Sequence, residues 1–547
     1  MASFLNFASA SAVSLAVAQG QQPHFGAKAP RSRLASQRPG FPASQHLCAS
    51  AVQLSLCSDA QTYVDFSHNP PALYYTALIM VHFGTSGWRG VIGRDITFRK
   101  VRIVTQALLD TLRSHGPLDA PILIGYDTRM LSEKFAATAA RILTSNGISV
   151  ETAARDCPSP VLAFAVRRRG AAAGLMFTGS HNAPEYNGLK IYTDQGILAP
   201  SDYTAPIEIR YRELEAGWDD IFLSDSRLHS EHDPKTEYLE QLQGLIDWDA
   251  IKRSGLRLVV DPLYGSTREY LDHILLENSL DATIIHNTRD PFFGGYAPNC
   301  SSVNLGRLRD VMRRKSAHLG LATDGDGDRF GILDHGAKMC DSSHLIALIL
   351  DYLARRRGLK GGVGRSLATS MLIDAVAKSH GLDVIETSVG FKSFGPMLVD
   401  GTLEFAGEES AGLAWSKHLP ERDGLLACLL TVEMAAVEGK TISELVHRLE
   451  ERVGRYYFRR TQLPQTEGRR ELLERRRLQE WTELGGRTIV KVDRRDGLKL
   501  TFEGGSWLLI REAGTEKKFR LYAEGRTGEE MRKLMHQAKK IFTNRRL

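Results

Sequence analysis

The sequence predicts an α/β protein with three related α/β domains, followed by a C-terminal α+β domain. Three stretches alternate short apolar runs with helical periods, a pattern typical of mixed, mostly parallel sheets covered by helices. The tail at 487–524 instead has several short apolar runs around turn signals. A chain of 547 residues is also too long for a single hydrophobic core, so several domains are expected.

The expected elements follow the apolar runs in order. The predicted strands are at 80–83, 121–125, 148–151, 174–178, 256–261, 282–286, 366–369, 383–387, 403–405, 507–510 and 519–522. The predicted helices are at 131–145, 266–278, 371–380, 464–480 and 528–542. The predicted α/β domains are 80–229, 230–338 and 339–453, the α+β domain is 454–547, and 1–79 is a disordered leader or a misassigned start.

The composition excludes several classes of protein. Apolar residues make up 42% and charged residues 24%, which is typical of a soluble globular protein. The net charge of +6 does not gather into one basic stripe, so we expect no nucleic-acid partner. No run of 18 apolar residues occurs, so no membrane span is expected. The six cysteines lack Cys-x-x-Cys spacing, which favours neither zinc nor a disulfide framework.

The N-terminal region allows two interpretations. Residues 1–58 contain no Asp or Glu and ten Ser, the composition of an organellar transit peptide. Alternatively, Met80 starts the protein and the preceding residues are not part of it. We favour the second interpretation and expect a cytoplasmic protein, with a plastid or another organelle as the alternative.

The Ser180 loop is the first candidate for chemistry. Ser180 follows the predicted strand 174–178, and α/β sheets bind their ligands at the carboxyl ends of strands. A lone Ser in such a loop is usually structural, and Ala183 breaks the nucleophile elbow pattern of hydrolases. The polar neighbours His181 and Lys190 favour a Ser that carries a phosphoryl group, with Lys190 as a proton carrier if nearby cations lower its pKa.

Three aspartates predict a metal site. Asp324, Asp326 and Asp328 alternate with glycines after an apolar run, so the loop can curl and bring three carboxylates around one hard cation. The spacing does not fit an EF-hand, because Arg329 and His335 occupy its glycine and glutamate positions. The small number of protein ligands favours Mg²⁺ with a position open to a phosphate oxygen.

Four further loops are weaker signals. Glu408, Glu409 and Ser410 lie between glycines and suit adjacent sugar hydroxyls, although a plain acidic surface loop fits as well. The loop 387–392 follows another predicted strand and could line the same cleft. Arg511–Thr515 can cradle an anion, and so can 83–90, but each fits a simple turn equally well.

Together these loops resemble the α-D-phosphohexomutase superfamily, the phosphoglucomutases and phosphomannomutases. The resemblance covers about 81–547, with the loops in family order. It implies three related α/β domains and a smaller, more mobile fourth domain around a central cleft. It also implies a phosphoserine enzyme that needs Mg²⁺ and a hexose 1,6-bisphosphate as primer.

The family's motifs assign roles to individual residues. The loop Thr-Ala-Ser-His-Asn-Pro matches 178–183, so the resemblance implies that Ser180 carries the phosphoryl group next to His181. The implied metal ligands are Ser180, Asp324, Asp326 and Asp328. Arg329 would lie beside the phosphoserine, and Arg89 and Lys190 would transfer protons. The implied substrate-binding residues are Gly390, Lys392, Glu408, Ser410, Arg511, Gly514 and Thr515.

The chain departs from the family pattern in two loops. Gly179 and Ala183 replace the usual Ala and Pro. In the phosphate loop, Glu512 and Ala513 replace Pro-Ser, which removes one hydroxyl donor and adds a negative charge near an anion site. A lost hydrogen bond to a charged group costs about 1.5–3 kcal/mol, so we expect weaker phosphate binding.

The resemblance implies interconversion of hexose 1-phosphate and hexose 6-phosphate through a hexose 1,6-bisphosphate. The double Glu at 408–409 is similar to glucose-preferring members, so glucose phosphate ranks first, with phosphomannomutase and phosphoglucosamine mutase as alternatives. A catalytically silent sugar-phosphate-binding relative and an Asp-x-Asp phosphatase are remote alternatives. The expected partners are hexose phosphates, and the expected state is a monomer or a homodimer.

Overall fold

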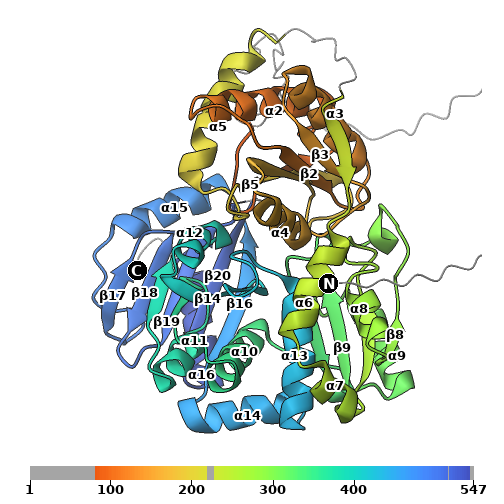
Figure 1. Ribbon diagram of the computed structural model, residues 1–547. Helices are drawn as coiled ribbons and strands as arrows, with labels where there is room; N and C mark the ends of the chain where they lie inside the picture. Colours follow the sequence, from red (N-terminus) through yellow and green to blue (C-terminus); the bar gives the residue numbers. More distant parts are fainter. Residues whose placement is uncertain (1–80, 219–226, 515–516, 543–547) are drawn as a thin grey trace, which may run out of the picture. The chain divides into compact units, whose positions relative to one another are not determined.

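The computed structural model describes residues 81–218, 227–514 and 517–542. All of them belong to one unit, Pro71–Leu547. The described residues form four sheets that follow one another along the chain, each with its own helices (Figure 1). In these residues no helix has both the length and the apolar character needed to cross a membrane.

The first sheet is mixed and has six strands in the order β1-β5-β4-β2-β3-β6. The strands are β1 (Trp88–Val91), β2 (Ile122–Tyr126), β3 (Val150–Ala153), β4 (Ala173–Phe177), β5 (Tyr186–Thr193) and β6 (His229–His232). Its helices are α2 (Phe98–Arg113), α3 (Ser132–Ser145), α4 (Ser159–Arg169) and α5 (Ser201–Glu215). β5 runs antiparallel to β1 and β4, while β4, β2, β3 and β6 are parallel. Helices α2, α3 and α5 cover one face and α4 the other (Figure 1).

The second sheet has five strands in the order β11-β10-β9-β7-β8. The strands are β7 (Arg257–Asp261), β8 (Asp281–Ile284), β9 (Leu319–Thr323), β10 (Phe330–Asp334) and β11 (Lys338–Met339). The helices are α6 (Lys235–Leu245), α7 (Trp248–Ser254), α8 (Leu271–Glu277) and α9 (Gly306–Lys315), with 3₁₀ turns η1 (Phe293–Gly295) and η2 (His335–Ala337). β8, β7 and β9 are parallel, and the hairpin β9–β10 carries the aspartate loop at its tip.

The third sheet has four strands in the order β13-β12-β14-β15. The strands are β12 (Gly362–Ser366), β13 (Val384–Thr387), β14 (Leu403–Glu408) and β15 (Gly412–Trp415). The helices are α10 (Ser342–Arg356), α11 (Leu372–Ser379), α12 (Gly395–Val399), α13 (Gly424–Glu438) and α14 (Ile442–Val453), with a 3₁₀ turn η3 (Phe391–Ser393). The hairpin β14–β15 turns at Glu409–Ala411, which is the predicted sugar loop.

The fourth sheet is fully antiparallel, with the order β16-β20-β19-β18-β17. The strands are β16 (Tyr457–Pro464), β17 (Ile489–Asp493), β18 (Leu498–Phe502), β19 (Trp507–Glu512) and β20 (Lys518–Gly525). Helices α15 (Glu467–Leu478) and α16 (Gly528–Lys540) contribute apolar side chains to the core on one face of this sheet.

The cores explain how the sheets are joined. The largest apolar cluster runs from α4 through the second sheet to α10 and α13, so the first three sheets share one core. Helix α13 is central to it, because α13 packs against β9 and β10 of the second sheet as well as against α10. The fourth sheet has a core of its own and meets the third sheet through a small patch that includes Leu367 and Trp507.

The predicted fold class is confirmed, but three of the predicted elements differ in extent or position from the prediction. Residues 81–83 form no strand, and the first strand is β1. The strand expected at 366–369 lies earlier, at β12, where glycines obscure the apolar pattern. The helix expected from 266 begins only at Leu271, because Thr267–Tyr270 form turns and Glu269 has a positive φ of 65°.

Candidate functional site

Ser180 lies in a buried loop between β4 and β5 and has a backbone φ of 50°. A positive φ is strained for a residue with a side chain, so other contacts must hold this loop. The Thr178 hydroxyl accepts a hydrogen bond from the Ser180 backbone N–H at 2.7 Å. The Ser180 hydroxyl lies 3.1 Å from Asp324 Oδ2 and 3.4 Å from His181 Nδ1. The predicted nucleophile and the aspartate loop therefore meet, although they come from different sheets.

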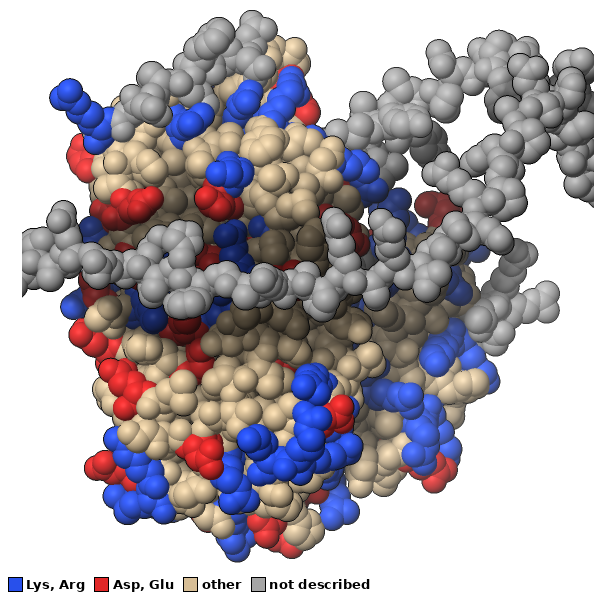
Figure 2. All heavy atoms as spheres, turned by 90° about the vertical axis from the view of Figure 1, so that its right-hand side faces the viewer, with Lys and Arg blue, Asp and Glu red and all other residues tan. Residues whose placement is uncertain are grey.

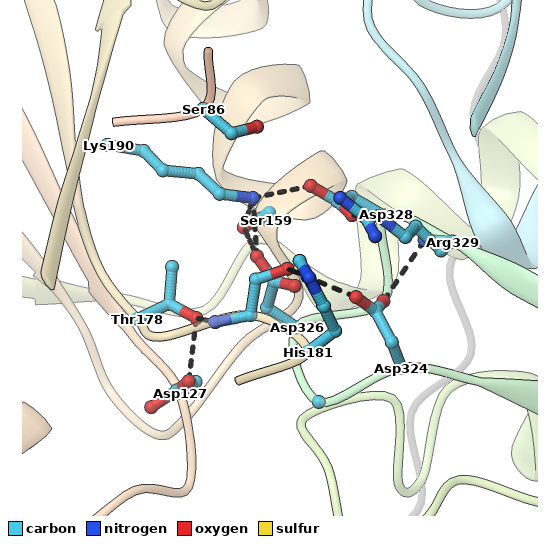
Figure 3. Close-up of polar contacts among 12 residues, drawn as sticks. Ser86, Asp127, Ser159, Thr178, His181, Lys190, Asp324, Asp326, Asp328 and Arg329 are labelled. Carbon is cyan, nitrogen blue, oxygen red and sulfur yellow. Dashed lines mark hydrogen bonds and ion pairs between the residues drawn. The ribbon is translucent and has the colours of Figure 1, made fainter. Parts of the chain in front are cut away.

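The buried guanidinium of Arg129 fixes the backbone of the Ser180 loop by hydrogen bonds. The Arg129 side chain is 0% exposed, and its Nε donates to Asp127 Oδ2 at 3.1 Å. Its two Nη groups donate to the backbone carbonyls of Ser180, Asn182, Ala183 and Tyr186. Asp127 in turn accepts a hydrogen bond from the Thr178 hydroxyl at 2.6 Å (Figure 3). The Asp127–Arg129 pair thus fixes the backbone on both sides of the strained residue.

The three aspartates of the β9–β10 turn form one buried cluster. Their ligand atoms all lie within 4.8 Å of one another. Asp326 Oδ1 and Asp328 Oδ1 are buried and have no hydrogen-bond partner within the described part of the chain. Burial and the other two carboxylates raise the pKa of Asp324 well above its usual value. A buried, convergent set of carboxylate oxygens with unused lone pairs fits a hard divalent cation such as Mg²⁺.

Lys190 points from β5 into the aspartate cluster (Figure 3). Its Nζ lies 2.5 Å from Asp326 Oδ2 and 2.5 Å from Asp328 Oδ2, and 3.2 Å from the Ser159 hydroxyl. The sequence made Lys190 a proton carrier on the condition that nearby cations lower its pKa, whereas its nearest charged partners in the structure are carboxylates. The Lys190 ammonium therefore offsets part of the negative charge of the aspartates, and it connects the first and second sheets.

Arg422 is a second buried cation, which the sequence analysis missed. It precedes α13 and lies 2.9 Å from Asp328 Oδ2, 2.5 Å from the Ser86 hydroxyl and 3.9 Å from Glu408 Oε2. Burial opposes its charge, but Asp328 and the neighbouring Glu421 raise the pKa of Arg422 far above its usual value. Arg422 thereby connects loops of the first, second and third sheets.

Arg89 is a further, partly buried cation of the site, and His181 lies close to it. Arg89 lies on β1, and its guanidinium donates to Asn182 Oδ1 at 3.0 Å. Burial and the charge of Arg329 lower the pKa of Arg89 to about 10. Burial and the charges of Arg329 and Arg89 also hold the pKa of His181 well below its usual value. His181 is therefore a neutral imidazole at neutral pH.

The predicted sugar loop and the loop 390–392 are fixed by hydrogen bonds to neighbouring backbone groups. Glu408 Oε1 accepts a hydrogen bond from the Gly390 backbone N–H at 2.8 Å. Burial and the charge of Glu409 raise the pKa of Glu408 to about 7. The Lys392 ammonium donates to the Gly84 carbonyl at 3.2 Å, so the loop 390–392 reaches the first sheet's N-terminal loop.

The predicted phosphate loop is described in part, because Thr515 lies outside the described residues. Arg511 is buried, and its Nε donates to Asp496 Oδ2 at 2.9 Å. Successive residues of a strand face opposite sides, and Glu512 accordingly lies 3.6 Å from Arg470 of α15. The expectation that Glu512 adds charge at the anion site is therefore wrong, because this carboxylate is paired on the other face.

One cavity of about 910 Å³ joins the Ser180 loop, the aspartate loop and the predicted sugar loop. It is lined by His181, Asp324, Arg329, Glu409 and Ser410, and by residues of β16 and β20. Glu408, Lys190 and Arg511 are buried and are not among the residues that line it. Figure 2 shows a hollow across the face of the molecule with acidic and basic side chains inside it.

The sequence patterns located the Ser180 and aspartate loops, but they missed Asp127, Arg129, Ser159 and Arg422. Asp127 and Arg129 follow the predicted strand 121–125, so the rule that ligands bind at carboxyl ends of strands could have singled them out. Arg422 had no local signal, since its role depends on contacts with residues 94 and 336 positions earlier.

Comparisons with known proteins agree with this arrangement. Models of the phosphoglucomutase/phosphomannomutase family match domain I at 80–217, domain II at 236–337, domain III at 341–453 and the C-terminal domain at 467–541. A phosphoglucomutase of Komagataeibacter xylinus is 30% identical over 81% of this chain and 87% of its own. A phosphoglucosamine mutase of Carboxydothermus hydrogenoformans is 28% identical over 81% of this chain and 95% of its own.

A solved structure is also similar to this chain in sequence and fold. The protein named "putative phosphomannomutase" from Thermus thermophilus is 30% identical, with a TM-score of 0.72, over 85% of this chain and 99% of its own. The family models match the four domains in order along the chain, and the fold agrees with that of the solved relative. The chain therefore belongs to the phosphoglucomutase/phosphomannomutase family.

Proposed function

We propose that this phosphohexomutase works through a phosphorylated Ser180 and prefers glucose 1-phosphate and glucose 6-phosphate. The observation that supports the proposal most is the Ser180 hydroxyl 3.1 Å from Asp324 Oδ2, at the edge of a buried carboxylate cluster that suits Mg²⁺. A serine in such a position can carry a dianionic group next to a divalent cation.

The proposed reaction has two phosphoryl transfers. In the first, the bond between phosphorus and Ser180 Oγ breaks, a bond to a free sugar hydroxyl forms, and that hydroxyl loses its proton. The product is a hexose 1,6-bisphosphate, which turns around in the cavity. In the second transfer its other phosphoryl group moves to Ser180 Oγ, and the sugar oxygen that it leaves takes up a proton.

The residues of the site suit these steps. Bound at Asp324, Asp326 and Asp328, Mg²⁺ would supply positive charge for the phosphate oxygens. Arg329 lines the cavity and adds fixed positive charge where charge develops during transfer. We assign proton transfer to Arg89 and Lys190; burial and the charge of Arg329 lower the pKa of Arg89 to about 10.

The proposed substrate-binding residues form two groups. Gly390, Lys392, Glu408 and Ser410 would read the sugar, with Glu409 beside them on the cavity wall. Arg511, Gly514 and Thr515 would hold the phosphate that is not reacting. The two adjacent glutamates are the ground for placing glucose first, because the loop 407–410 is similar to the loops of glucose-preferring members.

Phosphomannomutase and phosphoglucosamine mutase are the alternative activities, since relatives with these names match a similar share of the chain. A coupled assay with glucose, mannose and glucosamine 1-phosphates, Mg²⁺ and a hexose 1,6-bisphosphate primer separates the three. The highest kcat/KM is expected for glucose 1-phosphate, and equal values would refute the glucose preference.

The nucleophile is tested by Ser180→Ala. With labelled glucose 1,6-bisphosphate, the unmodified protein should acquire one covalent phosphate on Ser180, while the variant should acquire none and lose interconversion. Ser201→Ala, at the exposed start of α5, is the matched control and should keep both properties. Normal interconversion by Ser180→Ala would refute the assignment.

A further inference from the structure

The cavity wall formed by the fourth sheet carries two arginines that the proposed reaction does not use. Arg460 on β16 and Arg520 on β20 both line the cavity. In the strand register, Arg520 lies directly opposite Arg511 on one side and opposite Gln462 on the other. Residues opposite each other, or two apart on a strand, share one face of a sheet. Arg511, Arg520 and Arg460 therefore form a row that starts at the phosphate loop.

The two arginines differ from the other cations near them. Within the described ranges, neither the Arg460 nor the Arg520 side chain makes a hydrogen bond or an ion pair. Arg511, by contrast, is bound to Asp496, and Arg495 is bound to Asp493 and Glu386. A guanidinium that lines a cavity without an acidic partner is available to an anionic ligand.

The row also reaches toward the reacting end of the cavity. His181 and Asp324 line the same cavity as Arg460 and Arg520. Two guanidinium groups without an acidic partner therefore line the same cavity as the neighbour of Ser180.

The turning intermediate needs such a surface. A hexose 1,6-bisphosphate carries two phosphate groups, and while it turns neither group lies at its end of the cavity. Loss of the intermediate at this point leaves Ser180 without its phosphate and stops the cycle. Unpaired guanidinium groups between the two ends can bind either phosphate in transit, because their forked N–H donors match phosphate oxygens.

We propose that Arg520 and Arg460 form a transit site for the hexose 1,6-bisphosphate and hold it in the cavity between the two phosphoryl transfers. This inference rests on the proposed phosphoserine mechanism and adds two residues outside the phosphate loop. The site binds the bisphosphate in preference to a monophosphate, since only the bisphosphate always has a phosphate free to contact the wall.

The test compares Arg520→Gln and Arg460→Gln with Arg459→Gln in the full chain. Arg459 is the matched control, because it is exposed and lies next to Arg460 on the opposite face of β16. Carbon-labelled glucose 1-phosphate reports how much free bisphosphate is released for each glucose 6-phosphate formed. A second measurement gives the concentration of added glucose 1,6-bisphosphate that supports half-maximal rate.

In Arg520→Gln, the released bisphosphate per glucose 6-phosphate and the bisphosphate concentration for half-maximal rate should each rise about ten-fold. This is the factor that the loss of one charged hydrogen bond produces. A smaller rise is expected in Arg460→Gln and none in Arg459→Gln. The rate at which phosphate leaves Ser180 for glucose 1-phosphate in a single turnover should not change. Arg460 is exposed at the sheet edge, so its replacement keeps the test valid if Arg520→Gln unfolds.

The inference is overturned if both variants fold and release no more bisphosphate than the control. It is equally overturned if the single-turnover transfer from Ser180 slows enough to explain the whole effect. A failure of the proposed function gives a different result, since the unmodified protein would then neither carry phosphate on Ser180 nor convert any hexose phosphate.

Discussion

The Ser180 loop depends on one buried side chain that never touches the substrate. The N–H groups of Arg129 donate hydrogen bonds to four carbonyls of the loop and to Asp127. The guanidinium also lies over the ring of Phe293 in the 3₁₀ turn η1. These contacts hold Ser180 at its positive φ and keep its hydroxyl aimed at Asp324. Arg129 is therefore a positioning residue for the proposed nucleophile.

Arg129→Lys should lower kcat/KM about a hundred-fold, because a lysine cannot span four carbonyls and a shift of about 1 Å at a reacting atom has an effect of this size. The fall should appear in kcat more than in KM, together with slower labelling of Ser180 by a bisphosphate. Arg141→Lys, at an exposed position of α3, is the control. Normal labelling in Arg129→Lys would contradict the positioning role.

At the scale of elements, the site depends on how closely α13 approaches the aspartate loop. Gly424 begins α13, and its backbone N–H donates to the Gly327 carbonyl at 3.0 Å. A Cβ on Gly424 would lie 2.4 Å from the Arg329 carbonyl oxygen. Only a glycine allows this approach, so the helix buttresses the backbone that presents Asp326 and Asp328.

Gly424→Ala should displace that backbone and weaken Mg²⁺ binding about ten-fold, the lower end of what changes behind a metal site produce. Calorimetric titration with Mg²⁺ or Mn²⁺ measures this directly, without reference to turnover. Gly468→Ala in α15 is the control, since a Cβ there meets no atom within 4 Å. Unchanged metal affinity in Gly424→Ala would show that the loop does not need this contact.

The same elements show which features the sequence could predict. Ser180 and the aspartates follow buried apolar strands, so local pattern and the strand-end rule were sufficient to identify their loops. The pattern could not predict that the first and second sheets would bring Ser180 and Asp324 together. β16 was missed because Arg459, Arg460 and Gln462 give this edge strand a polar sequence, and its pairing with β20 becomes evident only in three dimensions.

For the whole molecule, the joint between the third and fourth sheets contains a charged cluster around Glu386. Glu386 on β13 contacts Arg365 of its own sheet at 2.7 Å and Lys499 of the fourth sheet at 2.8 Å. Burial opposes its ionisation, but the charges of Lys499 and Arg365 bring the pKa of Glu386 down to about 2. The same interface contains the apolar contacts of Leu367 with Trp507. It therefore helps to position the fourth sheet, which carries Arg520, against the third sheet, which carries the sugar loop.

Because its folded pKa lies below the ordinary value, Glu386 stabilises the fold fully above about pH 4.5, and this contribution is lost as the pH falls toward 2. At pH 7, Glu386→Gln should lower the free energy of unfolding by about 1–2 kcal/mol, once solvent screening of a partly exposed group is included. Urea unfolding at pH 7, 5 and 3.5 measures the difference from the unmodified protein, which should be constant down to pH 5 and smaller at pH 3.5. Glu503→Gln, in an exposed turn, should show no such difference at any pH. A loss that stayed the same at pH 3.5 would mean that Glu386 acts by packing and not by its charge.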